Sequence, residues 1–224
     1  MMRKLQFARK GAADPKALVI FLHGYGADGA DLLGLADVLA PHLPEVAFIA
    51  PDAIEPCKGS FGRQWFPVPW LDGSPQAASD AGIEVAAKDL DRFIDARLAE
   101  TGLGPEALVL VGFSQGAMMC LHVAPRRALP VAGVVAISGR LLFPERLAAE
   151  VLSKPPVLLV HGDEDPVVPF ADMARSGDAL IAAGFETFGH VMRGTAHGIA
   201  PDGLGVALQF IRERLKIGPV PPQG

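Results

Sequence analysis

Five short stretches of the chain are apolar at almost every position, without the alternation of a strand that faces water on one side. They are residues 17–22, 46–50, 108–111, 131–137 and 157–160. Runs of this length that end near Gly or Pro are typical of strands buried on both faces of a parallel sheet. The pattern therefore predicts a central, mostly parallel sheet.

Helical spacing separates these stretches. Over residues 80–98 the apolar side chains fall on one face of a helix: Ile83, Ala87, Leu90, Phe93, Ile94 and Leu98. Residues 171–183 and 203–215 are further helix candidates, and residues 187–192 alternate as an edge strand would. Strands that alternate with helices predict an α/β fold of three layers with right-handed crossovers.

No change in composition divides the chain, so we expect one domain over residues 1–217 and a Pro-rich, disordered tail over residues 218–224. The connection over residues 54–79 differs because it lacks periodicity yet contains four large aromatic residues: Phe61, Trp65, Phe66 and Trp70. A long irregular segment is usually functional or disordered, and aromatic residues argue against disorder. We therefore expect a functional loop there.

Charge and composition exclude several classes of protein. The 224 residues carry a net charge of −5 without a visible cluster of Lys and Arg, which argues against a nucleic-acid surface. No apolar run reaches the roughly 18 residues of a membrane span, and residues 1–10 lack the features of a signal peptide. The two cysteines, Cys57 and Cys120, are best interpreted as free thiols in a reducing compartment. We therefore expect a cytoplasmic protein.

A serine between two glycines follows the third apolar stretch directly. In Gly112-Phe113-Ser114-Gln115-Gly116 the G-x-S-x-G pattern comes after a predicted strand and before a helical pattern over residues 117–123. This is the context of a sharp turn that lifts a nucleophilic hydroxyl clear of a sheet. The helix start also directs N–H groups towards any anion that forms nearby. Ser114 is the predicted nucleophile if an acid and a base follow it.

A triad of this kind runs Ser, acid, His along the chain. The last of the five apolar stretches ends in an acidic turn, HGDEDPVVP over residues 161–169, where Asp163, Glu164 and Asp165 compete for the role of the acid. Pro166 restricts the backbone before it and so holds the Asp165 side chain in one direction. We favour Asp165 as the triad acid and interpret Asp163 as a residue that braces the turn.

Four histidines follow the nucleophile, and His197 is the best candidate for the general base. His122 falls in the helix after the nucleophile and is most simply a packing residue, His161 precedes the acid, and His190 lies in the expected edge strand. His197 lies in a loop between that strand and the last helix, where a flexible backbone can present an imidazole. A loop histidine is often incidental, but its position after the acidic turn favours catalysis.

A glycine-rich turn, HGYGADG over residues 23–29, follows the first apolar stretch. It lacks the spacing of dinucleotide-binding and P-loop motifs. In a hydrolase such a loop supplies one backbone N–H to an oxyanion hole, and the residue after the nucleophile supplies another. We expect these donors to be Tyr25 and Gln115, and we expect His23 to brace the loop.

Together these motifs resemble the phospholipase/carboxylesterase family, which includes bacterial carboxylesterases and acyl-protein thioesterases. The matching segments are FLHGYGADG over residues 21–29, GFSQG over 112–116, HGDEDPVVP over 161–169 and the loop around His197. The resemblance covers nearly the whole chain. It implies an α/β-hydrolase fold without a large cap domain that acts on carboxylic esters or thioesters without a metal or an organic cofactor. The segment CKGSFGRQWF over residues 57–66 is more similar to the bacterial members, which makes protein depalmitoylation the weaker expectation.

The resemblance also bears on the aromatic segment. Trp65 and Phe66 are the better pocket candidates, whereas Phe61 and Trp70 are nearly as well explained as residues that pin the loop. We expect a serine carboxylesterase for short- to medium-chain esters. A lysophospholipase or acyl-thioesterase is the alternative, and a catalytically silent binding protein is a weaker one. Apolar residues near the segment fit a homodimer as readily as a substrate.

Overall fold

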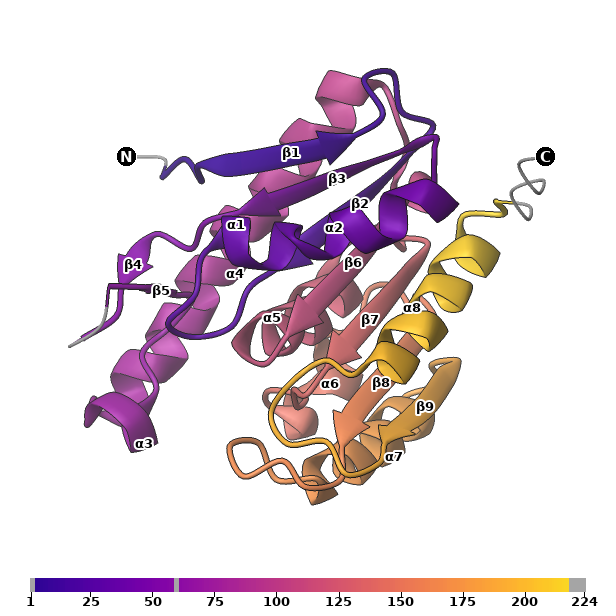
Figure 1. Ribbon diagram of the computed structural model, residues 1–224. Coiled ribbons are helices and arrows are strands. Elements are labelled where there is room, and N and C mark those ends of the chain that lie inside the picture. Colours follow the sequence, from indigo (N-terminus) through magenta and orange to yellow (C-terminus); the bar gives the residue numbers. More distant parts are fainter. Residues whose placement is uncertain (1–2, 59–60, 218–224) are drawn as a thin grey trace.

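A sheet of seven strands forms the centre of the molecule (Figure 1). The computed structural model describes residues 3–58 and 61–217, so the tail expected over residues 218–224 lies outside the described residues. The strands are β1 Phe7–Gly11, β2 Ala17–Leu22, β3 Val46–Pro51, β6 Leu108–Phe113, β7 Gly133–Ile137, β8 Val157–Gly162 and β9 Thr187–Met192. Their order is β1-β3-β2-β6-β7-β8-β9, and every neighbouring pair is parallel except β1 with β3.

The five apolar stretches form the five inner strands, and the expected edge strand over residues 187–192 is β9 at one border of the sheet. The prediction of a mostly parallel sheet is confirmed. Strand β1 at the other border was not predicted. All five of its residues are exposed, so it has no apolar pattern, and its backbone pairing with β3 holds it in place.

Helices cover both faces of the sheet (Figure 1). Those that share a core with one face are α4 Gln76–Thr101, α5 Gln115–Val123, α6 Pro144–Glu150 and α7 Ala171–Ala182. Those on the opposite face are α1 Gly29–Leu33, α2 Leu35–Leu39 and α8 Pro201–Arg214. Short 3-10 turns are η1 Ala40–His42, η2 Pro105–Ala107 and η3 Ala124–Arg126. Among the described residues no group of helices forms a separate cap.

Successive side chains of an inner strand enter different cores, as the pleat requires. In β2, Leu18 and Ile20 pack in the core that contains α4 and α5, whereas Val19 and Phe21 pack with α1, α2 and α8. All four side chains are fully buried. Burial of each such side chain contributes about 1.5–3 kcal/mol to stability. Burial on both sides is why these strands are apolar throughout.

The connection predicted to be irregular over residues 54–79 contains short elements. Strand β4 Glu55–Pro56 pairs antiparallel with β5 Arg63–Gln64, helix α3 Pro69–Asp72 follows, and α4 begins at Gln76. The expectation of a wholly irregular segment is therefore wrong. Two-residue strands and a one-turn helix are too short to give a readable periodicity.

Candidate active site

Ser114 lies at the sharp turn between β6 and α5. Its backbone has φ 53° and ψ −116°, a conformation with positive φ that residues other than glycine rarely adopt. Such a conformation costs on the order of 1–3 kcal/mol and persists only where its surroundings impose it. Here the Ser114 N–H donates to the carbonyl of Ile137 at 2.8 Å, and the Ser114 carbonyl accepts from Met118 at 3.1 Å. The turn is therefore held by both the sheet and the helix.

The two glycines of the motif leave the room that this turn needs. A Cβ atom on Gly112 would lie 2.4 Å from the Gly116 backbone, and a Cβ atom on Gly116 would lie 1.9 Å from the Leu22 carbonyl oxygen. Both distances are well inside contact range. The pattern G-x-S-x-G thus reflects close packing of the turn against its own helix and against β2.

The turn brings three predicted residues into one hydrogen-bonded chain. His197 Nε2 lies 3.0 Å from Ser114 Oγ, and His197 Nδ1 lies 2.7 Å from Asp165 Oδ2. Because the carboxylate accepts at Nδ1–H, a neutral His197 ring presents Nε2 as the acceptor for the serine proton. The Asp165 side chain is fully buried, and the His197 side chain is 18% exposed. This is the spatial arrangement that activation of a serine hydroxyl requires.

Asp165 is held by two further donors. Its Oδ1 atom accepts from the amides of Val167 at 2.8 Å and Val168 at 2.9 Å. Burial raises the pKa of this carboxyl, but the hydrogen bonds from His197, Val168 and Val167 outweigh it, so the pKa lies below its usual value. The neighbouring His161 Nε2–H donates to the Val168 carbonyl at 3.0 Å and lies 3.5 Å from Asp165 Oδ2. The acid therefore stays ionised in a fixed orientation.

Asp163, the competing acid, faces the backbone. Its Oδ1 atom accepts from the Gly194 amide at 2.7 Å, which links the acidic turn to the loop that contains His197. Arg193 lies 3.7 Å from its other oxygen. Asp163 thus makes the bracing contact that was expected of it, and the structure places Asp165 beside His197.

Three other histidines, His23, His190 and His122, lie outside the hydrogen-bonded chain of Ser114, His197 and Asp165. His23 Nε2 accepts from the Ala53 amide at 3.0 Å, and its Nδ1–H donates to the Gly24 carbonyl at 2.8 Å, so it braces the glycine-rich turn. Burial lowers the pKa of His23, which keeps the ring neutral. His190 Nε2 pairs with Asp202 at 2.8 Å on the surface. His122 packs inside α5 against Phe143, and both of its ring nitrogens are without a hydrogen-bond partner among the described residues.

A cavity of about 120 Å³ opens beside the serine. Its lining is mainly apolar and consists of Tyr25, Phe66, Val68, Trp70, Leu71, Ser114, Gln115, Met118, Val167, Val168 and His197. The two predicted amide donors therefore belong to residues of the cavity wall. Among the described residues, neither the Tyr25 amide nor the Gln115 amide has a hydrogen-bond acceptor. Both remain available for an acceptor that enters the cavity.

The structure separates the four aromatic candidates differently from the sequence prediction. Phe66 and Trp70 line the cavity, but Trp65 and Phe61 do not. Trp65 is buried behind it, where its indole N–H donates to the His23 carbonyl at 2.9 Å, and Phe61 is fully exposed. The preference for Trp65 over Trp70 as a wall residue is thus wrong, because the indole N–H needs a buried acceptor and finds it under the glycine-rich turn.

Several wall residues were missed. Met118 lies one helical turn after Ser114, and Val167 and Val168 lie two and three residues after Asp165. Their sequence positions next to the catalytic candidates were a usable signal, because a helix places residues i and i+4 on one face. Val68 and Leu71 gave no such signal.

The Gln115 side chain fixes the aromatic segment to the nucleophile helix. Its Oε1 atom accepts from the Trp65 amide at 2.8 Å, and its Nε2 atom donates to the Phe66 carbonyl at 2.7 Å. Both bonds are buried. A single side chain therefore sets the position of Phe66 relative to Ser114, a role that the sequence analysis did not predict.

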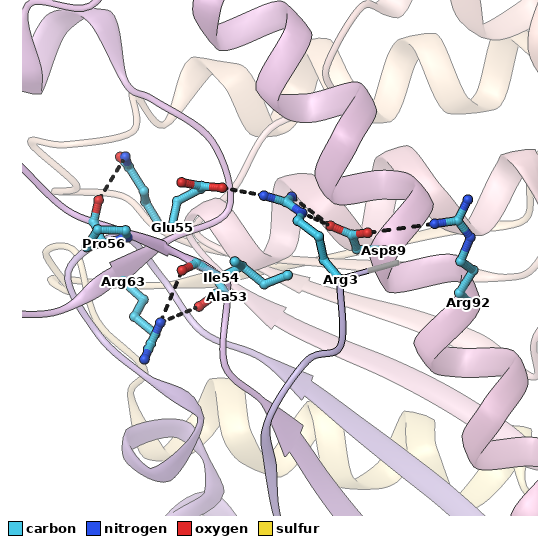
Figure 2. Close-up of polar contacts among 9 residues, drawn as sticks. Arg3, Ala53, Ile54, Glu55, Pro56, Arg63, Asp89 and Arg92 are labelled. Atoms are coloured by element: carbon cyan, nitrogen blue, oxygen red, sulfur yellow. Dashed lines mark hydrogen bonds and ion pairs between the residues drawn. The ribbon is translucent and has the colours of Figure 1, made fainter. Parts of the chain in front are cut away.

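The first residues of the same segment are anchored by arginines (Figure 2). Arg63 Nη1 donates to the carbonyls of Ala53 at 3.3 Å and Ile54 at 3.1 Å. Arg3 bridges Glu55 to Asp89 of α4, with Nε donating to Asp89 at 2.7 Å. The aromatic segment is thus held near its start by arginines and in its middle by Gln115.

Residues 3–58 and 61–217 contain neither a candidate metal site nor a candidate membrane span. No group of three or more His, Cys, Asp or Glu side chains there has the arrangement to hold a metal ion. No helix in these ranges has the length and apolarity to cross a bilayer. Cys57 and Cys120 are buried free thiols, and burial raises the pKa of both.

Comparison with known proteins identifies the family. The family model for phospholipase/carboxylesterase matches residues 5–215. The chain is 28% identical to esterase YpfH of Escherichia coli strain K12, over 87% of this chain and 82% of that protein. It is also 28% identical to acyl-protein thioesterase 1 of Gibberella zeae, over 91% of this chain and 93% of that protein. The crystal structure of esterase PE8 superposes with a TM-score of 0.90 at 44% identity, covering 95% of this chain and all of that one. The chain therefore belongs to the phospholipase/carboxylesterase family of α/β-hydrolases and is a serine hydrolase.

Proposed function

We propose that this protein is a serine carboxylesterase that hydrolyses short- to medium-chain carboxylic esters through an acyl-enzyme on Ser114. The observation that carries the proposal is the continuous chain of hydrogen bonds from Ser114 through His197 to Asp165. At its Ser114 end, this chain of hydrogen bonds lies beside a small apolar cavity.

The first half of the reaction forms the acyl-enzyme. Ser114 Oγ attacks the ester carbonyl carbon while its proton passes to His197 Nε2, and the carbonyl oxygen becomes an oxyanion. The carbon–oxygen bond to the alcohol then breaks, and His197 gives that proton to the leaving oxygen. Asp165 stabilises the imidazolium that exists between these steps, because it remains ionised.

Water completes the cycle in the second half. It loses a proton to His197 as it attacks the acyl carbon, and the proton returns to Ser114 Oγ when the acid leaves. In both halves we assign oxyanion stabilisation to the Tyr25 and Gln115 amides. Their unpaired state and their place in the cavity wall support the assignment. Such donors typically contribute 10²–10³-fold to kcat each.

The size of the cavity supports a short acyl chain. Its volume of about 120 Å³ is below the roughly 300–1,000 Å³ of pockets that enclose a drug-sized ligand. Trp70 and Leu71 narrow it and remain about half exposed. A long acyl chain would have to extend past these side chains into water.

Acyl-thioester hydrolysis is the second candidate, and one observation favours it: several relatives are named acyl-protein thioesterase 1. The same attack on the carbonyl carbon would release a thiol in place of an alcohol. A lysophospholipase is the third candidate. The expected homodimer and cytoplasmic location stay predictions.

A substrate panel with an active-site probe tests the proposal. A fluorophosphonate should label the wild-type protein and should not label Ser114→Ala. On p-nitrophenyl esters of increasing chain length, kcat/KM should peak at short chains and exceed the values for lysophosphatidylcholine and an acyl-CoA. Failure of Ser114 to label would contradict the enzymatic role, and a strong preference for long-chain lysolipids would contradict the substrate class.

A further inference from the structure

Arg140 lies directly beside the nucleophile turn. It follows β7 through Ser138 and Gly139, and a Cβ atom on Gly139 would lie 3.0 Å from the Ser114 carbonyl oxygen and 2.5 Å from the Ala117 side chain. Only a glycine therefore allows the chain to pass so close to the start of α5. This close approach places the next residue, Arg140, at the edge of the active site.

The Arg140 guanidinium is stacked on a wall residue of the cavity. Its Cζ atom lies 4.9 Å from the centre of the Trp70 ring, within the range of a cation–π contact. Trp70 is about half exposed and lines the cavity that contains Ser114 and His197. One aromatic ring therefore connects the positive charge of Arg140 with the apolar wall around the ester.

The donors of Arg140 are uncommitted. Among the described residues its guanidinium makes no hydrogen bond, and its ion-pair contact is with Asp172 Oδ2 at 3.7 Å. In contrast, Arg126 donates to Glu150 at 2.8 and 2.5 Å, and to the His122 carbonyl at 2.7 Å. The fork of N–H groups on Arg140, at 38% side-chain exposure, is free to bind a ligand.

A second arginine shares the same carboxylate. Arg175 Nη1 lies 2.9 Å from Asp172 Oδ1, so two guanidinium groups flank one acid, and their sum leaves one positive charge. A cleft of about 120 Å³ lies between them, lined by Arg140, Leu141, Pro144, Asp172, Arg175 and Ser176. The described residues that line the Ser114 cavity include no Asp, Glu, Lys or Arg. The nearby Asp72 carboxylate is occupied by the amides of Val68 and Ser74.

We propose that Arg140, supported by Arg175, binds a carboxylate that the substrate carries at a distance from its ester group. The guanidinium fork matches the two oxygens of a carboxylate, and its stacking on Trp70 holds it in place for that contact. The preferred substrates are then monoesters whose acyl or alcohol part ends in a carboxylate. This inference rests on the proposed esterase function and defines its substrate class.

Matched substrate pairs test the inference. The acyl arm compares p-nitrophenyl hexanoate with the p-nitrophenyl monoester of adipate, and the alcohol arm compares phenyl butyrate with 4-carboxyphenyl butyrate. Arg140→Gln should lower kcat/KM for the carboxylate member of one arm about tenfold, the size expected for the loss of one charge-assisted hydrogen bond. The neutral members should change less than about twofold, and added salt should reduce the wild-type preference. For the carboxylate ester, kcat/KM of Arg140→Lys should fall between the values of the wild type and Arg140→Gln, because lysine keeps the charge but lacks the fork of N–H groups.

Arg92→Gln is the control, because Arg92 is also an exposed arginine with a long ion pair, 3.9 Å to the buried Asp89 (Figure 2). It should leave every substrate unchanged. An equal loss for neutral and charged esters in Arg140→Gln would overturn the inference and reduce Arg140 to a support for Trp70. No loss in either arm would overturn it as well.

A binding measurement separates this inference from the esterase proposal. In Ser114→Ala, calorimetric titration needs no turnover, and it compares methyl hydrogen adipate with methyl hexanoate and 4-carboxyphenyl butyrate with phenyl butyrate. Tighter binding of the charged ester in one pair, lost on adding Arg140→Gln, supports the carboxylate site even if the wild type hydrolyses none of the esters. Equal affinity within both pairs overturns it.

Discussion

The two ends of helix α5 contain polar side chains in opposite situations. At its start, Ser114 contacts His197, and the Gln115 side chain makes two buried hydrogen bonds. Near its end, His122 is fully buried, and among the described residues neither ring nitrogen has a hydrogen-bond partner. Burial, together with the charge of the neighbouring Arg126, lowers the pKa of His122 to about 4.

This contrast shows that directed partners, and not residue type, distinguish the two histidines. His197 has an ionised carboxylate on one nitrogen and a hydroxyl on the other, so its ring can accept and return a proton. In the described part of the chain, His122 has no acceptor for a second proton, so burial keeps it neutral. The first histidine is placed for chemistry, and the second fills space in the core.

Removal of the hydroxyl at the start of α5 should have the largest effect. Ser114→Ala should lower kcat for a p-nitrophenyl ester by about 10⁴–10⁶-fold, the scale seen for nucleophiles of such triads. The residual rate reports the oxyanion donors and binding alone. Its thermal unfolding midpoint, measured alongside, should not fall. A variant with near wild-type turnover would remove Ser114 from the mechanism.

Loss of charge behind His197 should come next. Asp165→Asn should lower kcat by about 10⁴-fold, because the amide does not stabilise the imidazolium or the correct tautomer. Asp163→Asn is the matched control: its contact is with the Gly194 amide, which an Asn oxygen still accepts, so the loss should stay within about tenfold. The reverse ranking in steady-state assays would mean that Asp163 is the acid.

The Gln115 side chain should have an intermediate effect. Gln115→Met leaves the Trp65 amide and the Phe66 carbonyl without partners, which should cost about 2–4 kcal/mol of unfolding free energy. Because Phe66 loses its fixed place in the cavity wall, the preference for short acyl chains should weaken. Gln209→Met, which removes an exposed bond to Glu213, is the control in the same urea titration. Unchanged stability and chain preference would show that the clamp is dispensable.

The smallest effect on activity, and a distinct effect on stability, is expected at the other end of the helix. His122→Leu should leave kcat/KM within about twofold, because the ring does not contact the cavity. In the wild type the folded-state pKa of His122, about 4, lies below the unfolded value near 6.5. The unfolded state therefore binds a proton at His122 before the folded state does as the pH falls. The neutral ring's contribution to the free energy of unfolding is complete above pH 6.5 and is lost as the pH falls to 4, a change of about 3 kcal/mol.

Urea unfolding between pH 7 and pH 4 measures this difference. The wild type should lose more stability over that interval than His122→Leu, and carboxylates that titrate near pH 4 affect both proteins alike. The acids Glu84 and Glu150 and the base Arg146 also face the ring and enter its titration. Parallel stability curves for the two proteins would contradict the assigned neutral state.

Much of the fold could be predicted because the inner strands are buried on both faces. Apolar runs such as residues 17–22 and 108–111 then predict buried strands, and the two glycines predict the strand-to-helix turn at Ser114. Strand β1 was missed because all five of its residues are exposed, so its pairing with β3 leaves no apolar pattern in the sequence. Ser114, Asp165 and His197 were named from chain order, since a parallel sheet brings the loops after its strands to one edge.

The sequence by itself thus determined the layered α/β architecture, the turn at Ser114 and the order of the three polar residues. Tertiary structure alone decided which aromatic side chains line the cavity beside Ser114. Trp65 and Trp70 lie five residues apart in the same segment, yet one is buried with its N–H on the His23 carbonyl and the other lines the cavity beneath Arg140. Their difference depends on a hydrogen-bond acceptor and a charge from the connections that follow the distant strands β2 and β7, which no local pattern records.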